Sequence, residues 1–148
     1  MLRLFICVAL SFLPAGLTLA QSPYTKTVNG VTFYLGVIPA EIVRGHPTEH
    51  PESTMHGSAP TGSGSRHIVV ALFDAKSGER ITDAKVSARV ERLGLSADIK
   101  DLDPMQIAGT VSYGNYYAMP TGEIYKIRVV VKRRGSPRPI EAEFEYRP

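Results

Sequence analysis

The chain has 148 residues, with 17 basic and 14 acidic side chains and a single cysteine. This length suits one domain with a buried core, and a net charge of +3 without a long basic block argues against a nucleic-acid-binding protein. The one dense basic group, Lys132-Arg133-Arg134, ends a predicted strand, where solvated charges are usual.

Residues 1–20 are typical of a secretory signal peptide. Arg3 precedes the apolar run Leu4–Leu13, and residues 18–20 place small side chains before a cleavage point at Gln21. The run is too short to span a bilayer, and an uncleaved anchor is the alternative. We therefore expect a mature chain of residues 21–148 that is exported to a bacterial periplasm and has no stable membrane insertion. Cleavage removes Cys7, so the mature chain has no disulfide and no thiolate ligand.

The first strand signals flank a turn pair. Asn29-Gly30 predicts a tight hairpin between Tyr24–Val28 and Val31–Ile38, and Pro39 ends the second strand. The later run His67–Asp74 is apolar at both alternating sets of positions. That pattern predicts a central strand that is buried on both faces.

The middle of the chain alternates less regularly. Ala84–Leu93 predicts a strand with one wet face. Leu95–Pro104 alternates poorly and predicts a connection, with room for a short helical turn. Met105–Tyr113 predicts a strand, and Gly114-Asn115 predicts a turn or a bulge after it.

The last two strands are the clearest. Tyr125–Lys132 and Ile140–Tyr146 alternate apolar and charged residues, and Gly135-Ser136-Pro137 turns the chain between them. Helix signals are almost absent. About seven short strands separated by turns predict one all-β domain at 21–148, an immunoglobulin-like antiparallel β-sandwich.

A loop at 44–66 concentrates metal-ligating residue types. It carries three of the four histidines and one of the four methionines, and the fourth histidine opens the next strand. With Met119, which lies beside aromatic residues in a predicted turn, the candidate metal ligands are His46, His50, Met55, His56, His67 and Met119. Imidazole and thioether without thiolate favour copper, with zinc or iron as alternatives. The competing interpretation is a polar loop without a metal, with methionine as core filler.

His67 is the best anchored of these candidates, because a strand holds a side chain more rigidly than a loop does. The nearby tyrosines Tyr113, Tyr116 and Tyr117 pack in the sheet, or else form a wall beside a metal site or a partner contact.

Catalytic signatures are missing from the sequence. It has no G-x-S-x-G elbow, and the glycine-rich stretch GSAPTGSGS has neither a lysine nor a strand–helix context for a phosphate loop. We therefore do not expect an enzyme.

Two stretches resemble exported bacterial domains. HIVVALFDAKSGERITDAKVSARV resembles the first strand pair of YtkA-like and FixH-like domains, and AGTVSYGNYYAMPTGEIYKIRVVVKRRG is similar to the end of Tpd-type periplasmic iron-transport accessory proteins. The resemblance covers about residues 67 to 134. It implies an immunoglobulin-like fold, copper binding through His and Met, and action beside a membrane iron permease. In the Tpd-type pattern a His precedes Tyr-Gly, whereas Ser112 precedes Tyr113-Gly114 here. The family's ligand set is therefore not carried over whole.

Two functions follow as expectations. The first is a periplasmic copper-binding protein that acts as a chaperone, buffer or accessory to an inner-membrane metal transporter or a metalloenzyme. The second is a non-metal protein–protein interaction module of the envelope, which would use the sandwich edge and the tyrosines.

Overall fold

A computed structural model describes residues 22–44, 60–95 and 97–148. It confirms an all-β antiparallel fold, with eight strands in place of the expected seven or so and one short helix in the described residues. The predicted signal peptide lies outside the described residues. The elements are β1 Thr25–Val28, β2 Val31–Pro39, α1 Ala40–Arg44, β3 Ser65–Asp74, β4 Lys85–Arg92, β5 Asp98–Ile107, β6 Thr110–Ala118, β7 Tyr125–Lys132 and β8 Ile140–Tyr146.

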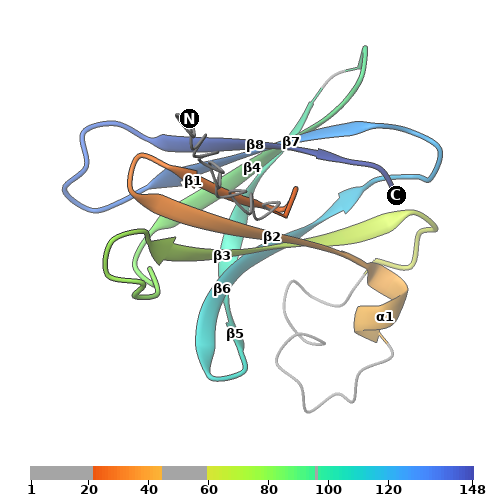
Figure 1. Cartoon of the computed structure of the whole chain (residues 1–148). Coiled ribbons are helices and arrows are strands. Elements are labelled where there is room, and N and C mark those ends of the chain that lie inside the picture. The colour runs from red at the N-terminus through yellow and green to blue at the C-terminus, as the bar shows by residue number, and fades with distance from the viewer. Residues whose placement is uncertain (1–21, 45–59, 96) are drawn as a thin grey trace, which may run out of the picture.

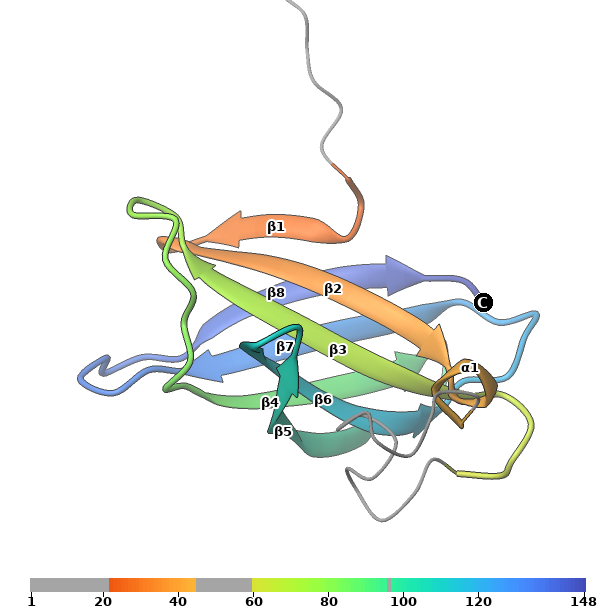
Figure 2. The ribbon, with the colours of Figure 1, turned by 90° about the horizontal axis from the view of Figure 1, so that it is seen from below.

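The strands follow the order β1-β2-β3-β6-β5-β4-β7-β8 and fold into two layers (Figures 1 and 2). Strand β5 belongs to both layers, because its first half pairs with β4 and its second half with β6. The two edge strands are bridged by side chains. The rings of Tyr24 and Tyr146 lie 6.4 Å apart, and Lys26 Nζ donates to the carbonyl oxygen of Glu143. This arrangement leaves one interior between the layers.

The interior is filled by the alternating apolar residues that the strand patterns predicted. Ile68, Val70 and Leu72 of β3 face residues such as Val86 and Phe144 from the other layer. Removing this apolar surface from water is the main stabilising contribution.

The tyrosines Tyr113 and Tyr117 also enter this core. The Tyr117 hydroxyl donates to the carbonyl oxygen of Ala88 at 2.9 Å and so links β6 to β4. Burial raises the pKa of the Tyr117 phenol, and burial also raises that of Tyr113. Both phenols therefore stay neutral and act as structural hydrogen-bond partners.

The predicted first hairpin is confirmed. Asn29 and Gly30 have φ of 45° and 79°, the left-handed geometry of a two-residue turn, and Val28 pairs with Val31. Strand β3 is central, since it pairs with β2 and β6. The prediction that both faces of β3 are buried was only partly right. The consecutive residues His67 and Ile68 are buried, but further along the strand every second residue is only half-buried.

The prediction of a connection over Leu95–Pro104 was wrong, and so was the helical turn within it. The segment forms most of β5. Its pattern is irregular because the strand changes partner halfway, so that Leu102 belongs to the interior while Met105 is buried outside the main core. Buried residues three apart cannot share one face of a strand, which hid the period of two.

The predicted single strand Met105–Tyr113 was also wrong. It is a hairpin in which Ala108 and Gly109, with φ of 49° and 76°, form the turn between β5 and β6, and Ile107 pairs with Thr110. In Figure 1 this teal hairpin extends downward from the other strands. The hairpin places Met105 directly across from Ser112.

Gly114-Asn115 is not a turn or a bulge, because β6 runs straight through it. Gly114 pairs with Val69 on one side and Asp103 on the other, and its missing side chain serves packing rather than turning. The short helix α1 was not predicted. Its Ala40 and Val43 pack against Tyr116, so tertiary contacts stabilise a segment too short to be helical alone.

Candidate metal centre

His67 lies on the outer face of the sheet, away from the main core. Its neighbour Ile68 points into the interior, and successive residues of a strand point to opposite faces. The imidazole is nevertheless only 2% exposed. It stacks on the ring of its cross-strand partner Tyr116, with centroids 4.5 Å apart and planes inclined by 22°. The sequence prediction of a rigidly held histidine is therefore consistent with its place in a central strand.

Met105 reaches the same spot from β5, and it is 1% exposed. A Cβ atom built on Gly114 would lie 2.6 Å from Met105 Cε and 2.8 Å from His67 Nε2. The methyl end of Met105 and the imidazole of His67 thus both approach the bare Cα of Gly114. We call this pair of side chains the His67–Met105 site.

The helix α1 and the start of β3 frame this site. Val43 of α1 packs with Tyr116, and Pro60 lines a shallow hollow of ≈ 350 Å³ together with Tyr116. The chain therefore leaves the described residues at Arg44 and re-enters them at Pro60 beside the ring that stacks on His67. Figure 1 shows α1 next to the end of β2, at this end of the sheet.

Four predicted ligands lie in the segment between these two points. His46, His50, Met55 and His56 are outside the described residues. Chain length limits only their distance from the described fold: each residue spans at most about 3.5 Å, and His46 follows Arg44 by two residues while His56 precedes Pro60 by four.

Met119 follows β6 and lies in the main core. It is fully buried in the cluster that contains Ile68, and its backbone N–H donates to the carbonyl oxygen of Gly64 at 2.8 Å. Its role as a ligand stays a prediction. The methionine that the structure brings to His67 is Met105, which is not among the ligands predicted from the sequence. Had Ala108-Gly109 been recognised as a hairpin turn, Met105 would have been placed beside Ser112 and Gly114.

Ser112, where the Tpd-type resemblance expects a histidine, is 3% exposed and bonded to an arginine. Arg80 Nη2 donates to Ser112 Oγ at 2.7 Å, and Arg80 Nε donates to the carbonyl oxygen of Val111 at 2.8 Å. The guanidinium carbon also lies 4.7 Å from the centre of the Phe73 ring. The guanidinium of Arg80 is thus held at Ser112, which lies two residues from Gly114 on the same face of β6.

Asp103 is an acidic residue near the site. It pairs with Gly114 on the strand next to β6 and is exposed. Within residues 22–44, 60–95 and 97–148, no three His, Cys, Asp or Glu side chains gather closely enough to hold a metal ion. The described residues therefore supply an imidazole and a thioether, with a carboxylate close by. That donor chemistry suits copper, since thioether prefers Cu(I) and imidazole accepts both oxidation states.

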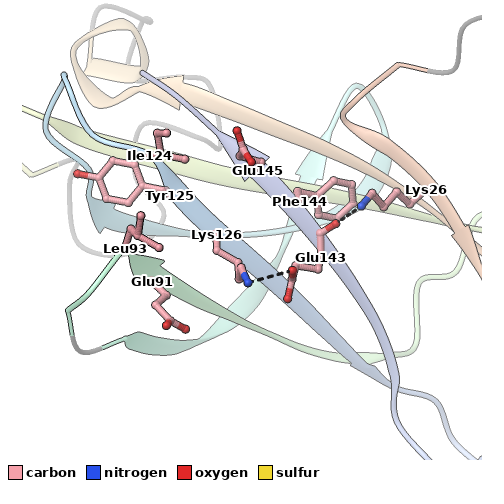
Figure 3. Close-up of a pocket in the computed structure, with 9 residues that line it drawn as sticks. All are labelled: Lys26, Glu91, Leu93, Ile124, Tyr125, Lys126, Glu143, Phe144 and Glu145. Atoms are coloured by element: carbon pink, nitrogen blue, oxygen red, sulfur yellow. Dashed lines mark hydrogen bonds and ion pairs between the residues drawn. The ribbon is translucent and has the colours of Figure 1, made fainter.

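A separate surface hollow of ≈ 440 Å³ lies over β7 and β8 (Figure 3). Two of its charged side chains, Lys126 and Glu143, form an ion pair at 3.4 Å. Its lining residues are Lys26, Glu91, Leu93, Ile124, Tyr125, Lys126, Glu143, Phe144 and Glu145. This lining contains neither histidine nor methionine, so its chemistry differs from that of the His67–Met105 site.

No helix in the described part of the chain is long and apolar enough to cross a membrane. No family model matches the chain, and no curated protein matches it in sequence.

Solved structures do share the fold. A DUF4426 family protein from Pseudomonas aeruginosa PAO1 is similar with a TM-score of 0.62 and 12% identity, over 84% of this chain and 94% of that chain. FetP of uropathogenic Escherichia coli strain F11, expressed recombinantly in the periplasm of E. coli, has a TM-score of 0.61 and 14% identity, over 83% and 91%. A copper-bound variant of Campylobacter jejuni P19, with isoleucine in place of a methionine, has a TM-score of 0.59 and 13% identity, over 83% and 92%.

At these identities the likeness establishes the fold alone. The resemblance to YtkA-like and FixH-like domains stays a prediction. The chain has the fold of a group of proteins that includes copper-bound FetP and P19.

Proposed function

We propose that this chain is a periplasmic protein that binds a transition metal, copper first, and handles it as a chaperone, a buffer or an accessory to an inner-membrane transporter or metalloenzyme. The observation that carries the proposal is the approach of His67 Nε2 and of the Met105 methyl end to Gly114, with both side chains buried. Copper-bound structures of similarly folded proteins add support.

The protein environment suits a tightly held soft ion. Tyr116 covers one face of the His67 ring, and the strands on both sides of β3 fix its position. Burial of Met105 keeps its thioether away from water and from oxidation at the surface. Zinc and iron remain alternatives, the latter because Asp103 offers the carboxylate that Fe(II) usually requires.

The segment 45–59 would complete the ligand set. It carries His46, His50, Met55 and His56, and both of its ends join the described fold beside Tyr116. A strand-anchored pair with further ligands from an adjoining segment suits a site that must take up and release its ion.

Copper titration of the mature chain tests this proposal. We expect one ion per chain with submicromolar affinity, and His67→Ala should weaken binding by about tenfold or more because it removes a nitrogen ligand. Ser87→Ala, at a half-buried position of β4 that faces away from the interior, is the control and should leave affinity unchanged. Wild-type protein that binds no stoichiometric copper at micromolar metal would refute the proposal.

The second candidate is an envelope interaction module. Its support is a group of exposed apolar side chains, Leu93, Leu95 and Ile99, around the β4–β5 connection, with Leu93 86% exposed. The pH dependence separates the two functions. Metal must compete with protons for imidazole, so copper binding should weaken below about pH 6, whereas an apolar contact need not change.

A further inference from the structure

Arg80 is held rigidly beside the His67–Met105 site. Its two hydrogen bonds, to Ser112 Oγ and to the Val111 carbonyl oxygen, fix the guanidinium against β6. Stacking on Phe73 restricts it further. Ser112 is the cross-strand partner of Met105 and lies two residues from Gly114, roughly 7 Å along the strand. The guanidinium is therefore a fixed neighbour of the site.

The charge of Arg80 is not neutralised by an ion pair among the described residues. Its acceptors are a hydroxyl and a carbonyl oxygen, both uncharged. The ion pairs of the described residues involve other basic groups, such as Arg89 with Glu91 and Arg133 with Asp74. The guanidinium of Arg80 is therefore a positive charge without an anionic partner among these residues.

We infer that Arg80 biases the metal site towards monovalent copper, an inference that rests on the proposed function of the same site. A fixed positive charge repels a divalent ion twice as strongly as a monovalent one at the same place. The backbone spacing of Ser112 and Gly114, roughly 7 Å, sets the scale of this separation, and at such a scale in a half-buried environment Coulomb's law makes the difference about tenfold or more in affinity. Where the Tpd-type pattern has a histidine, this chain has Ser112, whose hydroxyl accepts a hydrogen bond from the cationic Arg80.

Asp103 carries the opposite charge to Arg80, so its replacement should shift the copper preference in the opposite direction. It lies across from Gly114 on β5, and its carboxylate favours a divalent ion. Because Asp103 is exposed, solvent screens it more than it screens the half-buried Arg80. The guanidinium should accordingly dominate the preference of the site.

The test measures Cu(I) and Cu(II) affinity separately on the mature chain. Cu(I) is supplied under nitrogen from a chromophoric chelator, and Cu(II) is supplied from a competing glycine buffer. We expect the Cu(I)-to-Cu(II) affinity ratio to fall by about tenfold in Arg80→Gln, to stay near wild type in Arg80→Lys, and to rise in Asp103→Asn. Urea unfolding of each variant checks that the fold is retained, and Ag(I) serves as a monovalent probe that does not change oxidation state.

The outcomes are distinguishable. A ratio that falls in Arg80→Gln but not in Arg80→Lys supports the inference. An unchanged ratio in Arg80→Gln, with copper still bound, overturns the inference and leaves the proposed function standing. Wild-type protein that binds neither ion overturns both.

Discussion

Replacing Gly114 by alanine should lower the free energy of unfolding by about 1–3 kcal/mol, the usual cost of forcing an extra methyl into a packed region. The new Cβ would lie 2.8 Å from the carbonyl oxygen of Ile68, a backbone atom that cannot move without disturbing β3. It would also displace Met105 Cε and His67 Nε2. We expect copper affinity to fall together with stability, which urea unfolding and copper titration would measure.

Gly36→Ala is the matched control for this substitution. Gly36 also lies in a strand of the same sheet, but there a Cβ would meet its nearest neighbours on Val69 at 3.8 Å, an ordinary contact. Its unfolding free energy should therefore stay within about 0.5 kcal/mol of wild type. If the two alanine variants proved equally stable, the close approach of His67, Met105 and Ile68 to Gly114 would be ruled out.

Met105→Leu should weaken Cu(I) binding by about tenfold or more while costing less than about 1.5 kcal/mol of stability. Leucine keeps the volume of the side chain but has no thioether. Met119→Leu, made at a methionine in the interior cluster, should leave Cu(I) affinity unchanged. The comparison is between two fully buried methionines, so burial alone cannot explain a difference.

The reverse result would restore the sequence-based choice. If Met119→Leu weakened Cu(I) binding and Met105→Leu did not, the ligand would be the methionine beside the tyrosines of β6. If both variants lost the same amount of Cu(I) affinity, the loss would not be specific to Met105. If both variants also unfolded at the same urea concentration as wild type, this result would contradict the His67–Met105 site as described.

The strands with a regular period of two were predictable from the sequence. The hairpin at Asn29-Gly30, the central β3 and the pair β7 and β8 all follow from alternation and turn chemistry. Strand β5 was not predictable in this way, because it pairs with β4 and then with β6, and Leu102 and Met105 face different surroundings. A strand shared by two layers loses the pattern on which the prediction depends.

The candidate site was partly predictable. His67 was identified because it combines a ligating side chain with a strand. Met119 was preferred as a methionine ligand because it lies beside aromatic residues in a predicted turn, and Gly114 was assigned to a turn or bulge because glycine usually marks one. Arg80 carries no sequence signal at all: its contact with Ser112 joins residues 32 positions apart and arises only when β3 and β6 pair.

X-ray absorption at the copper edge of the Cu(I)-loaded mature protein tests the central claim most directly. A site built on His67 and Met105 predicts both nitrogen and sulfur scatterers around the ion. Because residues 21–148 contain no cysteine, sulfur bound to the ion in this part of the chain must come from methionine, and the sulfur signal should weaken in Met105→Leu. A spectrum with nitrogen and oxygen scatterers only, unchanged in Met105→Leu, would contradict the account.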